Sequence, residues 1–97
     1  MPEKEKLGLV VKEVLKELKR CEKGRTWYKD PQKAVGIVME EALELLKAVN
    51  DYTEEKQSRV HPESFYPSSK LLKQIREEAV QTAAMAIRFL YHMHEYR

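Results

Sequence analysis

Three glutamates of this chain could together bind a metal ion. Glu41 and Glu44 are three residues apart, so a helix would place both carboxylates on one face, at the edge of its apolar stripe. Glu78 falls inside the apolar stripe of a later segment, and Gln81 follows it by three residues. Buried carboxylates are costly unless a cation or hydrogen bonds compensate them. Oxygen-only clusters suit hard divalent cations, Mg²⁺ above all. The pattern therefore predicts a Mg²⁺ site, of the kind that serves phosphate chemistry.

The alternative interpretation is a solvated, glutamate-rich helix face. The chain contains 16 acidic residues, so a Glu-x-x-Glu pair such as Glu41 and Glu44 arises easily by chance. The position of Glu78 favours the metal site, because this residue interrupts an apolar stripe and precedes an uncharged stretch, residues 79–87.

Three amphipathic segments must position these side chains. Apolar residues at helical spacing predict helices over about residues 3–23, 31–51 and 69–95. Asp30 is suited to cap the second helix and Pro31 to occupy its first position. The first stripe consists of Leu7, Val11, Val14, Leu18 and Cys21, and the second of Val35, Val38, Ala42, Leu45 and Val49, widened by Met39 and Leu46. Residues 52–68 are polar, contain two prolines and are expected to form a long loop, or a frayed helix end followed by a loop.

Composition restricts the class of protein. A chain of 97 residues with 42% hydrophobic residues predicts one folded domain, residues 1–97. A net charge of only +2 argues against nucleic-acid binding. No apolar run is long enough for a membrane span, and the charged N-terminus does not resemble a signal peptide. The single cysteine, Cys21, fits a reducing compartment, so we expect a cytoplasmic protein.

The length of the third predicted helix suggests assembly. A continuous helix over residues 69–95 would be roughly 40 Å long, which overshoots a compact domain of this size. Three such helices also leave more apolar surface than one short chain can cover. We therefore expect an all-α, antiparallel bundle of three main helices completed by homo-oligomerisation. The alternative is a monomeric bundle with a bent third helix.

Two short segments resemble a known family. They read EEALE at residues 40–44 and EEAVQ at residues 77–81. This pattern resembles the MazG-like all-α nucleoside triphosphate pyrophosphohydrolases, whose motif is Glu-Glu-x-x-Glu followed, after a variable interval, by Glu-x-x-Asp. The resemblance covers about residues 31–92. It implies a Mg²⁺-dependent enzyme, with Mn²⁺ able to substitute, that forms a homodimer or homotetramer. Such an enzyme hydrolyses nucleoside triphosphates to the monophosphate and pyrophosphate.

The resemblance also implies roles for individual residues. Glu41, Glu44 and Glu78 match the metal-binding carboxylates of the family. Gln81 stands where the family has aspartate, and it offers a neutral oxygen in place of a charge. The interval between the two half-motifs is also longer than is common in the family. Either Glu40 or Glu41 would accept the proton of the attacking water.

Three further residues are candidates for binding the nucleotide. Lys47 lies three residues after Glu44 and could reach a phosphate, or it is an ordinary solvated cation. Trp27 and Tyr28 precede the second helix and could stack on a base, or they close the end of the helical core.

Two functions therefore remain open from the sequence. The first is a nucleotide pyrophosphohydrolase, as the resemblance implies. The second is a helical oligomer whose catalysis is weakened or lost, acting as a structural or interaction module, and Gln81 is the residue that favours it.

Overall fold

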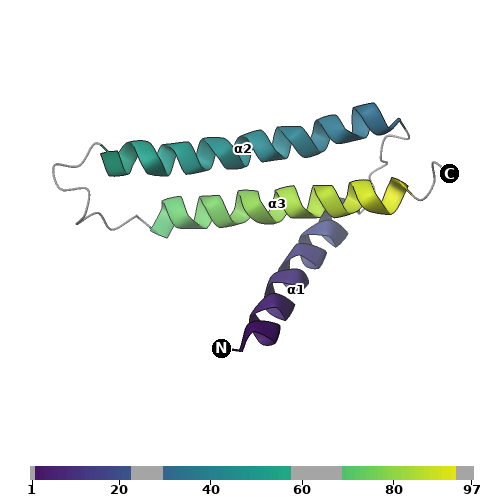
Figure 1. The fold of residues 1–97 in the computed structure, drawn as a ribbon, viewed down its shortest axis with the longest axis horizontal. Helices are drawn as coiled ribbons and strands as arrows, with labels where there is room; N and C mark the ends of the chain where they lie inside the picture. Colours follow the sequence, from purple (N-terminus) through teal and green to yellow (C-terminus); the bar gives the residue numbers. More distant parts are fainter. Residues whose placement is uncertain (1, 23–29, 58–68, 94–97) are drawn as a thin grey trace.

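The protein is described by a computed structural model over residues 2–22, 30–57 and 69–93, and this part of the chain consists of three helices without a strand (Figure 1). The helices are α1 (Glu3–Glu22), α2 (Pro31–Gln57) and α3 (Ser69–Met93). The expectation of an all-α fold with three main helices is thus confirmed for the described residues. None of these helices is both long and apolar enough to cross a membrane.

The start of α2 follows from its capping residues. The carboxylate of Asp30 accepts a hydrogen bond from the backbone N–H of Gln32 at 3.0 Å, and its backbone carbonyl accepts one from Ala34 at 3.0 Å. Pro31, which has no N–H to satisfy, occupies the first helical position. The predicted start of the second helix is therefore correct.

The end of α2 differs from the sequence prediction. The helix was expected to end at residue 51, with a loop over residues 52–68, but it continues to Gln57. Residues 52–57 contain no proline or glycine, and glutamate and lysine there are good helix formers. Thr53 also donates its hydroxyl to the carbonyl of Val49 at 3.0 Å. The rest of the expected loop, residues 58–68, lies outside the described residues, as do the predicted helical positions 23 and 94–95.

The three helices do not form a closed bundle. α2 and α3 run antiparallel and side by side, whereas α1 crosses α3 and its N-terminal half points away from the pair (Figure 1). The radius of gyration is 16.5 Å, compared with about 12–13 Å for a compact domain of this length. The chain is therefore more extended than a compact monomer.

The core of the described part is small and built around small side chains. A cluster of Val14, Cys21, Ala84 and Met85 joins α1 to α3 and is packed against Leu18, Ile37, Val38, Val80 and Ala83. Ala84 is fully buried, which lets neighbouring helices approach closely. No large side chain among the described residues is fully buried. Hydrophobic burial within the described part of one chain is therefore limited.

Two arginine–carboxylate pairs tie α1 to α3 within the described residues, and His92 of α3 also lies 3.6 Å from Glu22 of α1. Arg88 is 5% exposed and its Nε lies 2.7 Å from Oε1 of Glu22. Farther from the C-terminal end of α1, Arg76 makes a bidentate contact with Glu13, at 3.1 and 2.6 Å. Planar guanidinium groups suit such two-point contacts with carboxylates. These pairs fix the second half of α1, while its first half extends beyond them.

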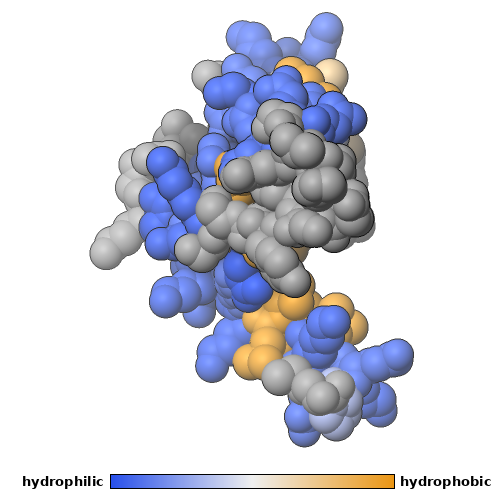
Figure 2. All heavy atoms as spheres, turned by 90° about the vertical axis from the view of Figure 1, so that its left-hand side faces the viewer, coloured by the Kyte–Doolittle hydropathy of each residue, from blue (hydrophilic) through white to orange (hydrophobic). Residues whose placement is uncertain are grey.

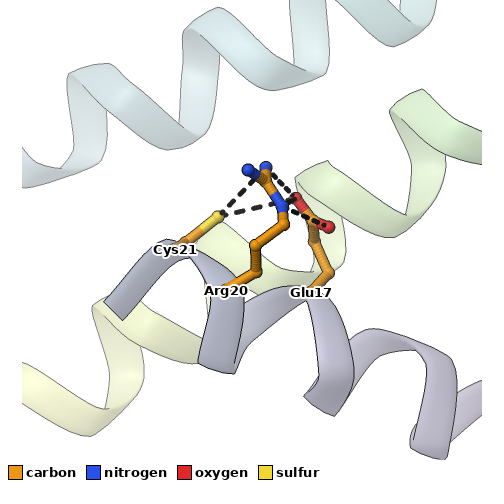
Figure 3. Close-up of polar contacts among 3 residues, drawn as sticks. All are labelled: Glu17, Arg20 and Cys21. Atoms are coloured by element: carbon orange, nitrogen blue, oxygen red, sulfur yellow. Dashed lines mark hydrogen bonds and ion pairs between the residues drawn. The ribbon is translucent and has the colours of Figure 1, made fainter. Parts of the chain in front are cut away.

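A further polar contact lies within α1 itself (Figure 3). Arg20 donates to Glu17 at 2.6 Å, and the thiol of Cys21 donates to the same carboxylate at 3.5 Å. The Arg20 guanidinium is the main reason that the pKa of Glu17 lies below its usual value. Cys21 is a buried thiol outside any disulfide, as its place on the apolar stripe predicts.

Candidate metal centre

The three glutamates singled out from the sequence converge between α2 and α3. Glu41 and Glu44 come from α2 and Glu78 from α3, and one carboxylate oxygen of each lies within 4.8 Å of the others. The two helices place these groups together because they pack side by side along this part of their length.

Helical spacing explains why Glu41 points toward α3. Ala34 and Ala48, both buried, lie seven residues before and after Glu41, so the three share one face of α2. Glu78 is likewise seven residues before buried Met85 on α3. Both carboxylates therefore project from faces that helix packing removes from water.

The electrostatics of the cluster are unfavourable without a counter-charge. Oε2 of Glu41 and Oε2 of Glu78 are buried and have no hydrogen-bond partner among the described residues. Burial, followed by the neighbouring carboxylates, raises the pKa of both groups above the usual value. The side chain of Glu44 is close enough to hydrogen-bond either of them, which two carboxyl groups can do only by sharing a proton.

These features fit a divalent cation. The donor set is oxygen alone, and it carries up to three negative charges on two helices. Hard cations such as Mg²⁺ prefer this kind of ligand. A cation between the helices would compensate the two buried oxygens that nothing in the described part of the chain satisfies. Glu41, Glu44 and Glu78 are the residues that would hold it.

Two of the remaining predicted site residues, Glu40 and Lys47, lie on α2, the helix that carries Glu41 and Glu44. Glu40 is exposed on α2 and lines a shallow hollow with Lys33, Gly36 and Ile37. Lys47 is exposed on α2. Trp27 and Tyr28 fall outside the described residues, so the structure places neither of them.

Gln81 is half-buried and faces the junction of α3 with α1. It lines a cleft of about 360 Å³ together with Glu13, Lys16, Glu17, Arg20, Glu77 and Val80. Glu13 and Glu17 are paired there with Arg76 and Arg20. Sequence reasoning missed this cleft, because it depends on where α1 crosses α3, and no local pattern encodes that crossing.

Comparisons with protein families, with curated proteins and with solved structures find no match to this chain.

Proposed function

We propose that the protein binds Mg²⁺ at Glu41, Glu44 and Glu78 and hydrolyses a nucleoside triphosphate between its α and β phosphates. The observation that supports this proposal best is the convergence of three carboxylates, two of them with buried, unsatisfied oxygens, between α2 and α3. The resemblance of residues 40–44 and 77–81 to MazG-like enzymes supplies the choice of reaction. Mn²⁺ would substitute for Mg²⁺, since both accept carboxylate ligands.

The chemistry is a displacement at phosphorus by water. Bound Mg²⁺ would neutralise phosphate charge and help to orient the substrate. Water attacks one phosphorus of the α–β anhydride, the bond from that phosphorus to the bridging oxygen breaks, and the products are nucleoside monophosphate and pyrophosphate. Glu40 or Glu41 accepts the proton that the water loses. Lys47, Trp27 and Tyr28 are the proposed contacts to the nucleotide, and a homodimer or homotetramer in the cytoplasm is the proposed working form.

The second candidate is a helical oligomer with weakened or absent catalysis that acts as an interaction module. The presence of Gln81 favours it, because an amide contributes no charge to a metal site. Metal binding without nucleotide hydrolysis would be the signature of this alternative.

The test is pyrophosphate release from a panel of ribonucleoside and deoxyribonucleoside triphosphates, with Mg²⁺, with Mn²⁺ and with a chelator. We expect release from one or a few nucleotides, only with metal. Glu41→Gln and Glu78→Gln should each abolish release while circular dichroism shows unchanged helix content. Glu77→Gln is the matched control, because Glu77 is the exposed neighbour of Glu78 and should be dispensable.

The outcomes separate the candidates. Full activity in either Glu41→Gln or Glu78→Gln would refute the assignment of these residues. A wild-type chain that binds metal but releases no pyrophosphate from any nucleotide would favour the interaction module.

A further inference from the structure

The apolar stripe of α1 is covered over only half its length. Val14 and Cys21 are buried in the cluster with α3, but Leu7 is 64% exposed and Val11 is 45% exposed. These residues belong to one stripe, since they follow each other at three- and four-residue steps. Toward its N-terminus, α1 points away from α3 and no longer contacts it (Figure 1). Hydrophobic side chains gather at the point where α1, the lowest helix in Figure 2, separates from the rest of the molecule. We call Leu7, Val10 and Val11 the free half-stripe of α1.

α2 has a second apolar face that no described helix covers. The face that contains Glu41 is turned toward α3. Met39 and Leu46, which are seven residues apart, lie on a different side of the helix and are 59% and 54% exposed. Val35 and Val49 lie near the same line and are also exposed. We call Val35, Met39, Leu46 and Val49 the outer stripe of α2.

The amount of exposed surface matches what a dimer interface would remove. The chain exposes 7926 Å² in total. A compact monomer of its mass, 11.5 kDa, exposes about 5,800 Å². The excess of about 2,000 Å² per chain is of the order that obligate homodimers bury, since their interfaces remove about 2,000–5,000 Å² in total.

We propose that a second copy of this chain covers both faces, with the free half-stripe of α1 in one copy packed on the outer stripe of α2 in the other. Under a two-fold axis this contact occurs twice, so each copy both gives and receives it. Pairing α2 with α2 alone would leave the free half-stripe of α1 in water in both copies. Reciprocal pairing covers both faces with a single kind of contact, made twice.

This interface is independent of the metal chemistry. It depends on apolar side chains of α1 and α2 and none of the three clustered glutamates belongs to it. Molecular mass in solution therefore tests it, whereas pyrophosphate release tests the proposed reaction. A failure of one is distinguishable from a failure of the other.

The first experiment is the mass of the full chain by light scattering and sedimentation, from about 1 to 100 μM. We expect a dimer, or an even assembly of dimers. Leu7→Lys and Met39→Lys should each raise the dissociation constant of the dimer about 30-fold or more, because a charge would enter an apolar interface. Leu9→Lys is the matched control. Leu9 is 56% exposed but lies two residues from Leu7, on another face of α1.

A disulfide experiment covers the case in which a lysine variant does not fold. We expect the double variant Val11→Cys, Met39→Cys to form a disulfide-linked dimer on mild oxidation, and the double variant Leu9→Cys, Met39→Cys to do so much less. A monomeric wild-type chain over the whole concentration range would overturn the proposal. Equal weakening by Leu9→Lys, or equal crosslinking through position 9, would overturn the assignment of these faces.

Discussion

At the scale of single residues, Glu41 is a charged side chain at a position where helix packing alone would favour an apolar one. It sits on the same face of α2 as Ala34 and Ala48, which are buried, and one of its own oxygens is buried without a partner. The sequence placed Glu41 at the edge of the apolar stripe. The structure places it on the face toward α3, because the apolar arc of α2 is wider than the stripe that the pattern identified.

The unsatisfied charge at Glu78 leads to a prediction for the metal-free protein. In chelator at neutral pH, Glu78→Gln should raise the melting temperature, because it removes a charge that burial and Glu44 disfavour. The gain should be small, because Glu78 is only partly buried and solvent screens its repulsion with Glu44. Adding Mg²⁺ should raise the melting temperature of the wild type but not of Glu78→Gln. Thermal denaturation followed by circular dichroism measures both effects, and a lower melting temperature for the variant in chelator would contradict the prediction.

The raised pKa values of Glu41 and Glu78 also predict a pH dependence. A carboxyl whose folded pKa lies above its unfolded value destabilises the folded state once it ionises. This penalty is absent at low pH, where both states are protonated, and it grows as the pH rises through the unfolded and then the folded pKa. Relative to the double variant Glu41→Gln, Glu78→Gln, the wild type in chelator should therefore gain stability as the pH falls from about 7 to 4.

The comparison with that double variant cancels the opposite pH dependence of stability that two other glutamates contribute. Arg76 and Arg20 hold the pKa of Glu13 and Glu17 below the usual value, so these two groups contribute stability that is lost as the pH falls. Both proteins share this loss. Urea denaturation at several pH values gives the difference, and a gap that does not narrow toward acid pH would argue against charge repulsion in the cluster.

At the scale of the elements, the attachment of α1 to α3 rests on a buried cation. Arg88 is almost fully buried beside Glu22, whose side chain is 38% exposed. Arg88→Leu should lower the free energy of unfolding by about 1–3 kcal/mol, because among the described residues Glu22 then keeps only His92, whose Nε2 lies 3.6 Å from Oε1 of Glu22, as a partner in a partly buried place. Arg20→Ala is the control, since the exposed pair of Arg20 with Glu17 should contribute less than about 1 kcal/mol. Urea denaturation measures both, and equal losses would show that burial of the pair is unimportant.

The close approach of the helices depends on Ala84. This residue is 0% exposed in the cluster that joins α1 to α3, so Ala84→Leu should cost about 1–3 kcal/mol by overpacking. Ala79→Leu, at an exposed position of the same helix, should change stability by less than about 0.5 kcal/mol. The free energies of unfolding in urea give the comparison. A tolerated leucine at position 84 would mean that this contact is loosely packed.

The elements were predictable to different degrees. Capping residues fixed the start of α2, because Asp30 and Pro31 act through local hydrogen bonds. The end of α2 was placed six residues too early, since polar composition was taken for a loop signal where helix formers continue the helix. The crossing of α1 over α3 was not predictable, because it depends on contacts such as Arg76 with Glu13 between distant parts of the chain.

At the scale of the whole molecule, one chain has an extended shape, and its described residues form only a small hydrophobic core. If two copies complete the fold, stability must depend on protein concentration, because the folded dimer is linked to dissociated chains by mass action. The melting temperature should therefore rise with concentration in the wild type and in Leu9→Lys. In Leu7→Lys it should be lower and nearly independent of concentration. Scanning calorimetry at several concentrations measures this, and a constant melting temperature in the wild type would speak against an obligate dimer.

The proposed function depends on the binding of a divalent cation by Glu41, Glu44 and Glu78. The most direct measurement is isothermal titration of the metal-free protein with Mg²⁺ and Mn²⁺, for the wild type, Glu78→Gln and Glu77→Gln. We predict saturable binding to the wild type and to Glu77→Gln, and its loss in Glu78→Gln with the helix content preserved. Absence of binding to the wild type, or an equal loss in Glu77→Gln, would contradict the metal site.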